Sequence, residues 1–355
     1  MVASRERSSR RTFLKTTLGA GGALTLAGCL EGDGGSGGGN STQNGSGGSG
    51  ASGDLVMLTS TETTSAYAMS QGISAVVSEN ADEVSVDARP SEGTNANIGA
   101  LDRNEADIVY IQNWTANKVM EGEDPFGDIS FTPNQVHHLY DLGWFLCTPN
   151  EGWETVADIE SGSRVSPTPR GSGTAEMLEQ ALSYVTEDYE RVSTDYGSQG
   201  SAMNEGRLDV GAGTFVNFSV EPSWLQEMKS TTDLRVLDFP DEVIGELEDD
   251  PAIVISEIET GELDGYAYLP EPLRTPALSY NFVVRNDADY DTIYTYLETV
   301  YGNREALQER NQLMAPLAEG EQFLANPYEM PFHPAAADFY EEQGVWSDEY
   351  ERGDE

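Results

Sequence analysis

The 355-residue chain is long enough for one large domain or two ordinary ones. Its 62 acidic and 19 basic residues give a formal net charge of −43, which argues against nucleic acid as a partner and is typical of proteins that fold in molar salt. Because 38% of the residues are hydrophobic and 9% are aromatic, most of the chain is predicted to fold rather than to form a disordered acidic polymer.

Residues 1–28 are predicted to be an export signal that ends at a membrane anchor. The stretch SRRTFLK at 9–15 fits a twin-arginine signal, and the weakly apolar run at 16–28 is shorter than the about 20 residues that span a membrane. The run leads into LAGC, which resembles a lipobox, so Cys29 is the expected lipidation site. Residues 29–53 are rich in Gly and Ser and are predicted to tether the folded part to the outer face of the cytoplasmic membrane.

Three strand–loop–helix units are predicted at the start of the folded part. A strand at 55–58 leads to a Ser/Thr-rich loop and to apolar residues at helical spacing between Ala66 and Val77, capped by Thr63, Thr64 or Ser65. A second strand at 84–90 is followed by a polar turn and a short helix. The third strand, ADIVYI, is followed by QNWTANKVMEG, a loop that enters a helix. Repeated units of this kind predict a parallel sheet with crossover helices.

The second half of the chain repeats this pattern. A strand at 163–167, a turn TPRGSGT and a helix at 175–185 are followed by a strand at 190–194. Two stretches, YGSQGSAMNEGRLDVGAGTF and SEGTNANIGALDRNEADIVYI, each predict a Gly-rich turn, a short helix and an apolar strand that begins after Asp. This similarity indicates two α/β lobes of like build. The Pro-rich stretch at 268–284 is predicted to be a strand that crosses between the lobes, and 287–310 to be mainly helical. Cys147, in the apolar run GWFLC, is predicted to be a small buried hydrophobe.

Few residues suggest catalysis or metal binding. The His residues are His137, His138 and His333, and neighbours on a strand point to opposite faces, so the first two are poorly placed to share a metal. The sequence has neither HExxH nor CxxC, and no cofactor is predicted. A Ser/His/Asp arrangement remains an alternative, because the spacing of its members along the chain is free.

The turn TPRGSGT resembles a phosphate-binding loop but does not fit one. A P-loop needs Lys and then Ser or Thr after its final Gly, whereas Gly173 is followed by Thr174 and Ala175. The turn still points backbone N–H groups and a helix N-terminus at one place, and Arg170 adds a guanidinium suited to a carboxylate. It is therefore predicted to bind an anion, the alternative being a capped helix with an exposed Arg.

The chain resembles the TAXI-type solute-binding proteins of TRAP transporters. The motifs that carry this resemblance occur in order over almost all of the folded part, at 60–77, 90–114, 154–182, 261–278 and 330–346. The first loop, TETTSAY, the turn IQNW and the closing HPAA depart from the family pattern, which bears on the identity of the ligand.

The resemblance implies a two-lobed α/β fold of the type II periplasmic-binding-protein kind, with the ligand in a cleft between the lobes. Lobe I is expected to comprise 54–143 and 277–355, and lobe II 144–276. It implies a receptor without enzymatic activity that passes a small carboxylate, glutamate-like or a dicarboxylate, to a TRAP-type permease. A receptor of similar fold for an ABC importer or a sensor, and a surface Ser hydrolase, are the alternatives.

The ligand-binding positions that the resemblance implies come from five loops. Each Thr or Asn among them has the alternative role of a helix cap or turn residue, and Tyr67 and Trp114 that of core residues. They are Thr61, Thr64, Tyr67, Asn95, Asn97, Gln112, Asn113, Trp114, Arg170, Gly171, Ser172, Gly173, Thr174, Thr214 and Asn217.

Overall fold

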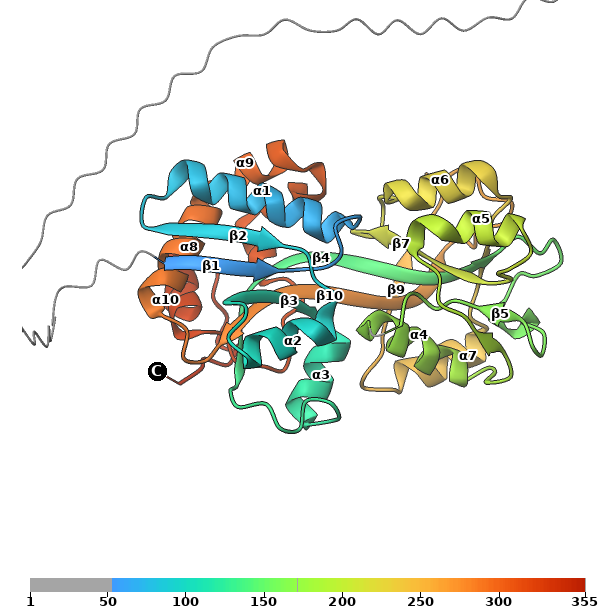
Figure 1. Cartoon of the computed structure of the whole chain (residues 1–355), viewed down its shortest axis with the longest axis horizontal. Helices are drawn as coiled ribbons and strands as arrows, with labels where there is room; N and C mark the ends of the chain where they lie inside the picture. Colours follow the sequence, from blue (N-terminus) through green and yellow to red (C-terminus); the bar gives the residue numbers. More distant parts are fainter. Residues whose placement is uncertain (1–52, 171, 355) are drawn as a thin grey trace, which may run out of the picture. The chain divides into compact units, whose positions relative to one another are not determined.

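An eight-stranded mixed sheet runs through the molecule in a computed structural model that describes residues 53–170 and 172–354 (Figure 1). The predicted signal, Cys29 and the tether up to residue 52 lie outside the described residues, as does Gly171. Six strands follow one another in the order β2-β1-β3-β10-β4-β7, while β8 pairs with β4 and β9 pairs with β10. The strands are β1 (Gly53–Leu58), β2 (Val84–Arg89), β3 (Ile108–Gln112), β4 (Pro133–Thr148), β7 (Gly211–Val216), β8 (Arg235–Leu237), β9 (Val254–Ile258) and β10 (Leu273–Arg285). A separate parallel pair joins β5 (Arg164–Val165) to β6 (Glu190–Arg191).

The helices cover both faces of this sheet (Figure 1). None of those in the described ranges combines the length and the apolar character needed to cross a membrane. The α-helices are α1 (Ser65–Asn80), α2 (Thr94–Asp102), α3 (Asn113–Glu121), α4 (Gly173–Ser183), α5 (Gln199–Asn204), α6 (Ser223–Thr231), α7 (Asp241–Glu248), α8 (Tyr290–Gly302), α9 (Arg304–Arg310) and α10 (Pro334–Gln343). Short 3₁₀ helices span Val156–Asp158, Tyr196–Ser198, Gln312–Ala318 and Gly320–Leu324.

The predicted parallel units are confirmed at one end of the sheet. Strand β1 pairs in parallel with both β2 and β3, and helices connect the three strands. In β2, Val84, Val86 and Ala88 are buried while the residues between them are exposed, as expected for a strand with one solvated face. Thr64 caps α1, because its hydroxyl accepts a hydrogen bond from the Tyr67 N–H at 3.4 Å.

The two longest strands, β4 and β10, join the two ends of the sheet. They run antiparallel from the pair Pro133–Arg285 to the pair Gly143–Ala277. Beyond that pair, β4 continues alongside β7 and β8, and β10 begins alongside β9. We call β1–β3 with α1–α3 and α8–α10 the β1 end, and β5–β9 with α4–α7 the β7 end (Figure 1). A crossing strand was predicted for β10, but β4 was expected only as the short apolar run around Cys147.

The core is continuous across the joined strands. Its largest cluster includes Met57 and Tyr296 of the β1 end together with Leu178 of the β7 end, all fully buried. Cys147 lies fully buried in β4, which confirms that it packs as a small hydrophobe, and burial raises the pKa of its thiol to about 12. The mixed α/β class expected from the sequence is therefore confirmed.

One predicted boundary was wrong. Helix α3 starts at Asn113 rather than after a loop, because the Gln112 side chain accepts the Thr115 N–H at 2.8 Å and caps the helix. The prediction that 287–310 is mainly helical is confirmed, since α8 and α9 cover most of that range and are separated at Asn303. The correction at α3 affects the site, since it places Asn113 and Trp114 on a helix.

Candidate functional site

A cavity of about 580 Å³ lies where the β1 end meets the β7 end. Its walls come from the loops after β1 and β2, from the Arg170 turn, and from the segments that lead into α5 and α6. Its floor is formed by side chains of β3, β4 and β10. The strands that join the two ends therefore also carry the base of the cavity.

Four helices start at the cavity wall. The residues at these starts are Ser65 of α1, Thr94 of α2, Thr174 of α4 and Ser223 of α6. The first N–H groups of a helix have no partner within the helix and carry partial positive charge. Hydroxyl groups from Ser60, Thr61, Thr63 and Thr64 line the same wall. The cavity is thus rich in hydrogen-bond donors and favours an anion without containing many cations.

Aromatic rings form the floor of the cavity. Tyr140 and Tyr280 are directly opposed on β4 and β10, and their rings stack with centroids 4.9 Å apart. The Tyr110 ring also stacks with Tyr280, with centroids 5.0 Å apart, and lies 6.3 Å from the Tyr140 ring. Burial raises the pKa of Tyr280 to about 12, so its phenol is neutral at neutral pH. Its hydroxyl lies 3.2 Å from the Thr174 hydroxyl, which connects the floor to the start of α4.

A second group of rings continues this floor toward the β7 end. The ring centroids of Trp144, in β4, and Tyr196 are 6.0 Å apart, and those of Tyr196 and Trp224, near the start of α6, are 5.0 Å apart. All three line the cavity. The indole N–H of Trp144 is buried and has no hydrogen-bond partner among the described residues.

Among the described residues that line this cavity, Arg170 is the one cationic side chain. It is exposed at the rim, together with the acidic side chains of Glu92, Asp195 and Glu227. Among the described Lys and Arg residues, only Arg170 and Arg304 have no carboxylate within ion-pair distance. Arg304 donates to two backbone carbonyls, whereas Arg170 makes one long contact, 3.4 Å, to the Arg191 carbonyl. The guanidinium of Arg170 is therefore left for an anion.

Gly173, the first residue of α4, packs tightly on the β1 end. A Cβ added to Gly173 would lie 2.2 Å from Nε2 of Gln112 and 2.7 Å from the Thr115 hydroxyl, so a larger residue there would push these side chains out of place. The Ser172 hydroxyl accepts the Ala175 N–H at 3.1 Å and caps α4. This packing brings the start of α4, from the β7 end, against the start of α3.

One carboxylate on α4 receives three donors from the β1 end. Glu176 accepts hydrogen bonds from Asn95 at 3.0 Å, from the Trp114 indole at 3.2 Å and from Lys118 at 3.0 Å. The Lys118 and Glu176 side chains are 17% and 35% exposed, so this ion pair is only partly screened by water. We call these four residues the Glu176 clasp.

Six of the predicted ligand-binding residues line the cavity, the other described ones lie outside its lining, and Gly171 is outside the described residues. Those at the cavity are Thr61, Thr64, Arg170, Ser172, Thr174 and Thr214. Asn95 and Trp114 belong to the clasp, and Tyr67 lies within α1, outside the lining. Buried Asn97 donates to the carbonyls of Thr59 and Tyr110, and buried Gln112 caps α3.

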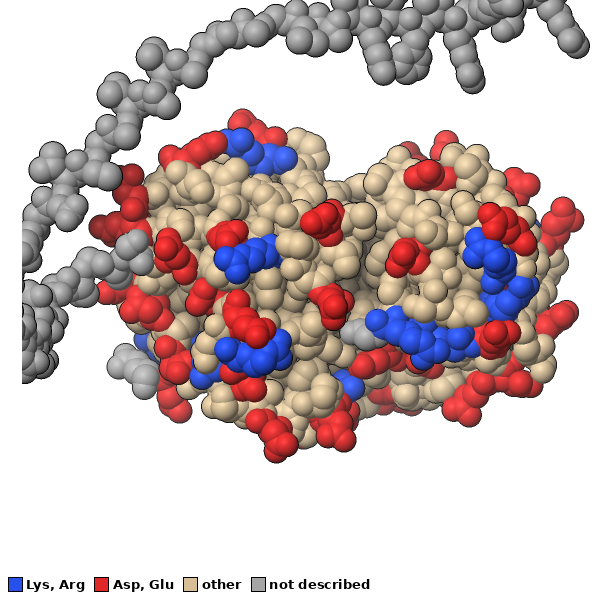
Figure 2. Space-filling model, in the orientation of Figure 1, with Lys and Arg blue, Asp and Glu red and all other residues tan. Residues whose placement is uncertain are grey.

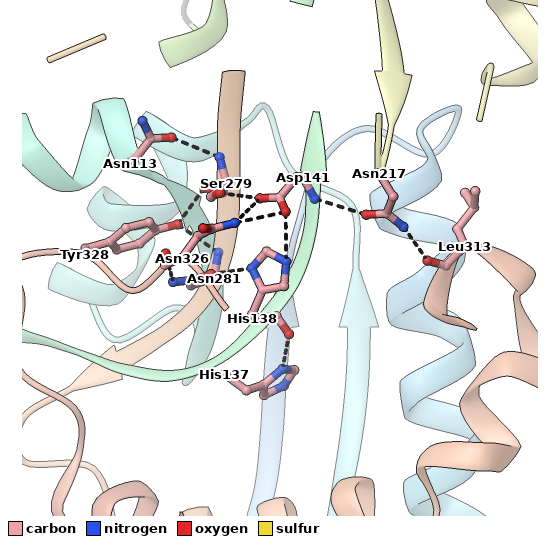
Figure 3. Close-up of polar contacts among 10 residues, drawn as sticks. All are labelled: Asn113, His137, His138, Asp141, Asn217, Ser279, Asn281, Leu313, Asn326 and Tyr328. Atoms are coloured by element: carbon pink, nitrogen blue, oxygen red, sulfur yellow. Dashed lines mark hydrogen bonds and ion pairs between the residues drawn. The ribbon is translucent and has the colours of Figure 1, made fainter. Parts of the chain in front are cut away.

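Asn113 and Asn217 belong to a polar network on the crossing strands (Figure 3). Asn113 accepts the Ser279 N–H at 3.0 Å, and Asn217 accepts the Asp141 N–H at 3.2 Å. Asp141 also accepts from Ser279 and Asn326 and lies 3.6 Å from Nε2 of His138. Asn113, Ser279, Asn326 and Tyr328 line a second cavity of about 750 Å³. These two predicted residues thus support the strands rather than the first cavity.

The aromatic residues of the floor are not among the predicted ligand-binding residues. Tyr110, Tyr140, Trp144 and Tyr280 lie in strands that are buried throughout or nearly so, and such strands show no alternation that would single out one face. The described residues contain no group of three or more His, Cys, Asp or Glu side chains placed to hold a metal ion.

A family model described as the NMT1-like family matches residues 57–344 of the chain. No curated protein is similar enough to this sequence to be matched.

Several solved structures are similar to the chain at low identity. The ligand-binding component of an ABC-type import system from Staphylococcus aureus, with zinc bound, has 10% identity over 85% of this chain and 97% of its own, with a TM-score of 0.41. A periplasmic binding protein from Brucella ovis with glutathione bound has 14% identity over 83% and 78%, with a TM-score of 0.42. A putative L-cystine ABC transporter protein from Listeria monocytogenes has 13% identity over 78% and 98%, with a TM-score of 0.41. At these scores, nothing about the ligand of this chain follows from them.

Proposed function

Because the chain belongs to the NMT1-like family, a family of solute-binding proteins, we propose that it binds a small carboxylate in the cavity and delivers it to a membrane transporter. The observation that carries the carboxylate assignment is Arg170. In a chain with a net charge of −43, it is a cation at the cavity rim without a carboxylate partner among the described residues. It stands beside the N-terminus of α4, so guanidinium and backbone donors converge on one place.

Binding is proposed to be coupled to closure of two lobes. The lobes are those expected from the sequence, 54–143 with 277–355 and 144–276, joined by β4 and β10. The Glu176 clasp supports this proposal, because its carboxylate comes from one lobe and its three donors come from the other. It lies within one helical turn of the Arg170 turn, so a ligand held there favours the arrangement in which the clasp is formed.

The transporter is proposed to be a TRAP-type permease, on the strength of the ordered motifs that resemble TAXI-type receptors. An ABC importer or a sensor of similar build is the alternative partner, and the gene next to this one would distinguish a multi-span permease from an ATPase. Export by the twin-arginine route and a lipid on Cys29 would place the receptor at the outer face of the cytoplasmic membrane.

No structural observation favours the Ser-hydrolase alternative. His137, His138 and His333 all hydrogen-bond within the fold, and none of them lines the cavity. A nucleophile in this cavity would therefore lack a His base within reach.

The proposal is tested by substituting Arg170. We expect R170A to weaken binding of a carboxylate ligand by about 2 kcal/mol, roughly thirtyfold in Kd, because a charge-assisted hydrogen bond is lost. Binding is measured by calorimetry in molar salt, after mass spectrometry of the denatured protein has shown whether a ligand co-purifies. R207A is the control, since Arg207 is an exposed Arg that pairs locally with Glu205. Equal affinity in R170A and the unmodified protein would contradict the assignment.

A further inference from the structure

We propose that the ligand carries a single carboxylate on an apolar, preferably aromatic, body rather than two carboxylates. This inference rests on the proposed function and concerns the same cavity. It follows from how charge and rings are distributed over the cavity walls.

The cavity offers a charged partner to one carboxylate only. Arg170 and the start of α4 form one anion-binding corner. The other charged side chains in the lining are the carboxylates of Glu92, Asp195 and Glu227, and the described lining contains no second cation. Glu92 lies just before α2, so one of the other helix starts has an acidic neighbour in the lining. A second carboxylate on the ligand would be desolvated without a cation and close to like charges.

The rest of the cavity is built for an apolar body. The stacked rings of Tyr110, Tyr280 and Tyr140 are followed by Trp144, Tyr196 and Trp224, which gives a continuous aromatic surface. Leu142 and Val216 lie among them in the lining. Apolar surface of this kind gains most from covering another apolar or planar group and gains little from a charged one.

The size of the cavity agrees with this ligand. Its volume, about 580 Å³, lies within the roughly 300–1,000 Å³ typical of sites for drug-sized molecules. Succinate or glutamate held at Arg170 would leave most of the aromatic floor facing water. A ligand with a ring or an alkyl chain attached to its carboxylate reaches from the Arg170 corner to Tyr196 and Trp224.

The test compares ligands that differ in one group. Hexanoate and adipate share their carbon chain, but adipate has a carboxylate where hexanoate has a methyl group; 3-phenylpropionate adds a ring. Each is titrated into the full chain in molar salt, with binding followed by calorimetry. We expect hexanoate to bind at least about tenfold more tightly than adipate, and 3-phenylpropionate more tightly than hexanoate. Glutamate and succinate complete the panel.

A substitution at Trp224 distinguishes the contribution of the aromatic surface to affinity from that of Arg170. Trp224 lies in α6 and is partly exposed. We expect W224A to lower the affinity for 3-phenylpropionate about tenfold and the affinity for adipate less than twofold. R170A should lower the affinity for both ligands, because both have a carboxylate.

Tighter binding of adipate, succinate or glutamate than of hexanoate would overturn the single-carboxylate inference while leaving the proposed carboxylate receptor intact. If no carboxylate binds and no ligand co-purifies, both the inference and the proposed function fail.

Discussion

His137 is a buried ring whose charge state the fold fixes. Its Nδ1 lies 2.7 Å from the His138 carbonyl, so Nδ1 carries the proton and donates it, and Nε2 accepts from the Tyr296 hydroxyl at 2.9 Å. The ring is 1% exposed and packs against Phe282 and Phe323. Burial lowers the pKa of His137 to about 4, so the imidazole stays neutral where an unfolded chain would bind a proton.

This difference predicts a loss of stability in mild acid. Since the unfolded His has a pKa near 6.5, the unfolded state binds more protons as the pH falls from about 6.5 toward 4, and the free energy of unfolding decreases over that window. Between about pH 7.5 and about pH 5 the expected loss from His137 is about 2 kcal/mol. Urea unfolding in molar salt at the two pH values measures it.

The control is H137Q, which keeps a polar side chain but removes the titrating group. Its absolute stability is irrelevant to the comparison, because only the change between the two pH values is used. If H137Q loses as much stability in mild acid as the unmodified protein, His137 does not titrate as its burial requires. His333, whose pKa burial also lowers and which has no contact with His137 among the described hydrogen bonds, contributes equally to both proteins.

Among the elements, α1 and α3 differ in how well the sequence predicts them. In α1 the spacing of Ala66, Met69, Ile73 and Val77 identifies the buried face, and a Thr cap marks its start. In α3 the cap is Gln112, which is not one of the usual capping residues, so the helix start is hidden and Asn113 and Trp114 appear to belong to a loop.

Long-range pairing explains what the sequence analysis missed in the site. The Arg170 turn is recognisable because Gly, Ser and Thr precede a helix within a few residues. The aromatic floor depends instead on β4 and β10, which pair Tyr140 with Tyr280 across 140 positions of sequence. Side-chain periodicity within one strand carries no information about that register. Local features of the cavity were therefore predictable, and its floor was not.

From the Glu176 clasp we expect that Glu176 affects ligand affinity although it does not line the cavity. E176Q removes the charge that Lys118 pairs with, and Lys118 is only 17% exposed. Weakening a contact made between the two ends should lower the population of the clasped arrangement and reduce ligand affinity about fivefold, about 1 kcal/mol. Calorimetry gives the affinity, and hydrogen exchange at the start of α4 reports on the clasp itself.

Glu179 provides a matched control on the same helix. Its carboxylate is 38% exposed and pairs with Arg191 at 2.8 Å, but both residues belong to the β7 end. E179Q therefore breaks an ion pair of similar exposure without loosening any contact between the ends. Equal effects of E176Q and E179Q on affinity would show that the clasp has no part in binding.

At the scale of the molecule, carboxylates are spread over both ends on the visible face, with fewer Lys and Arg among them (Figure 2). Most of the basic side chains are used in ion pairs with individual acids, for example Arg164 with Asp209 and Lys229 with Glu221. The remaining carboxylates repel one another without compensation. The net charge of −43 thus opposes the compact state, in which these charges are closer together than in the unfolded chain.

We therefore expect the melting temperature of the folded part to rise steeply with sodium chloride. The Debye length falls from about 10 Å at 0.1 M to about 3 Å at 1 M, which removes repulsion between carboxylates that are not in contact. The ion pairs, whose charged atoms lie within 4 Å, are screened less than this longer-range repulsion, so the net effect is stabilising. Salt also strengthens burial of apolar groups, and sucrose, which does so without screening charge, is the control. If sucrose raises the melting temperature as much as sodium chloride does, repulsion between carboxylates is not what limits the stability of this chain.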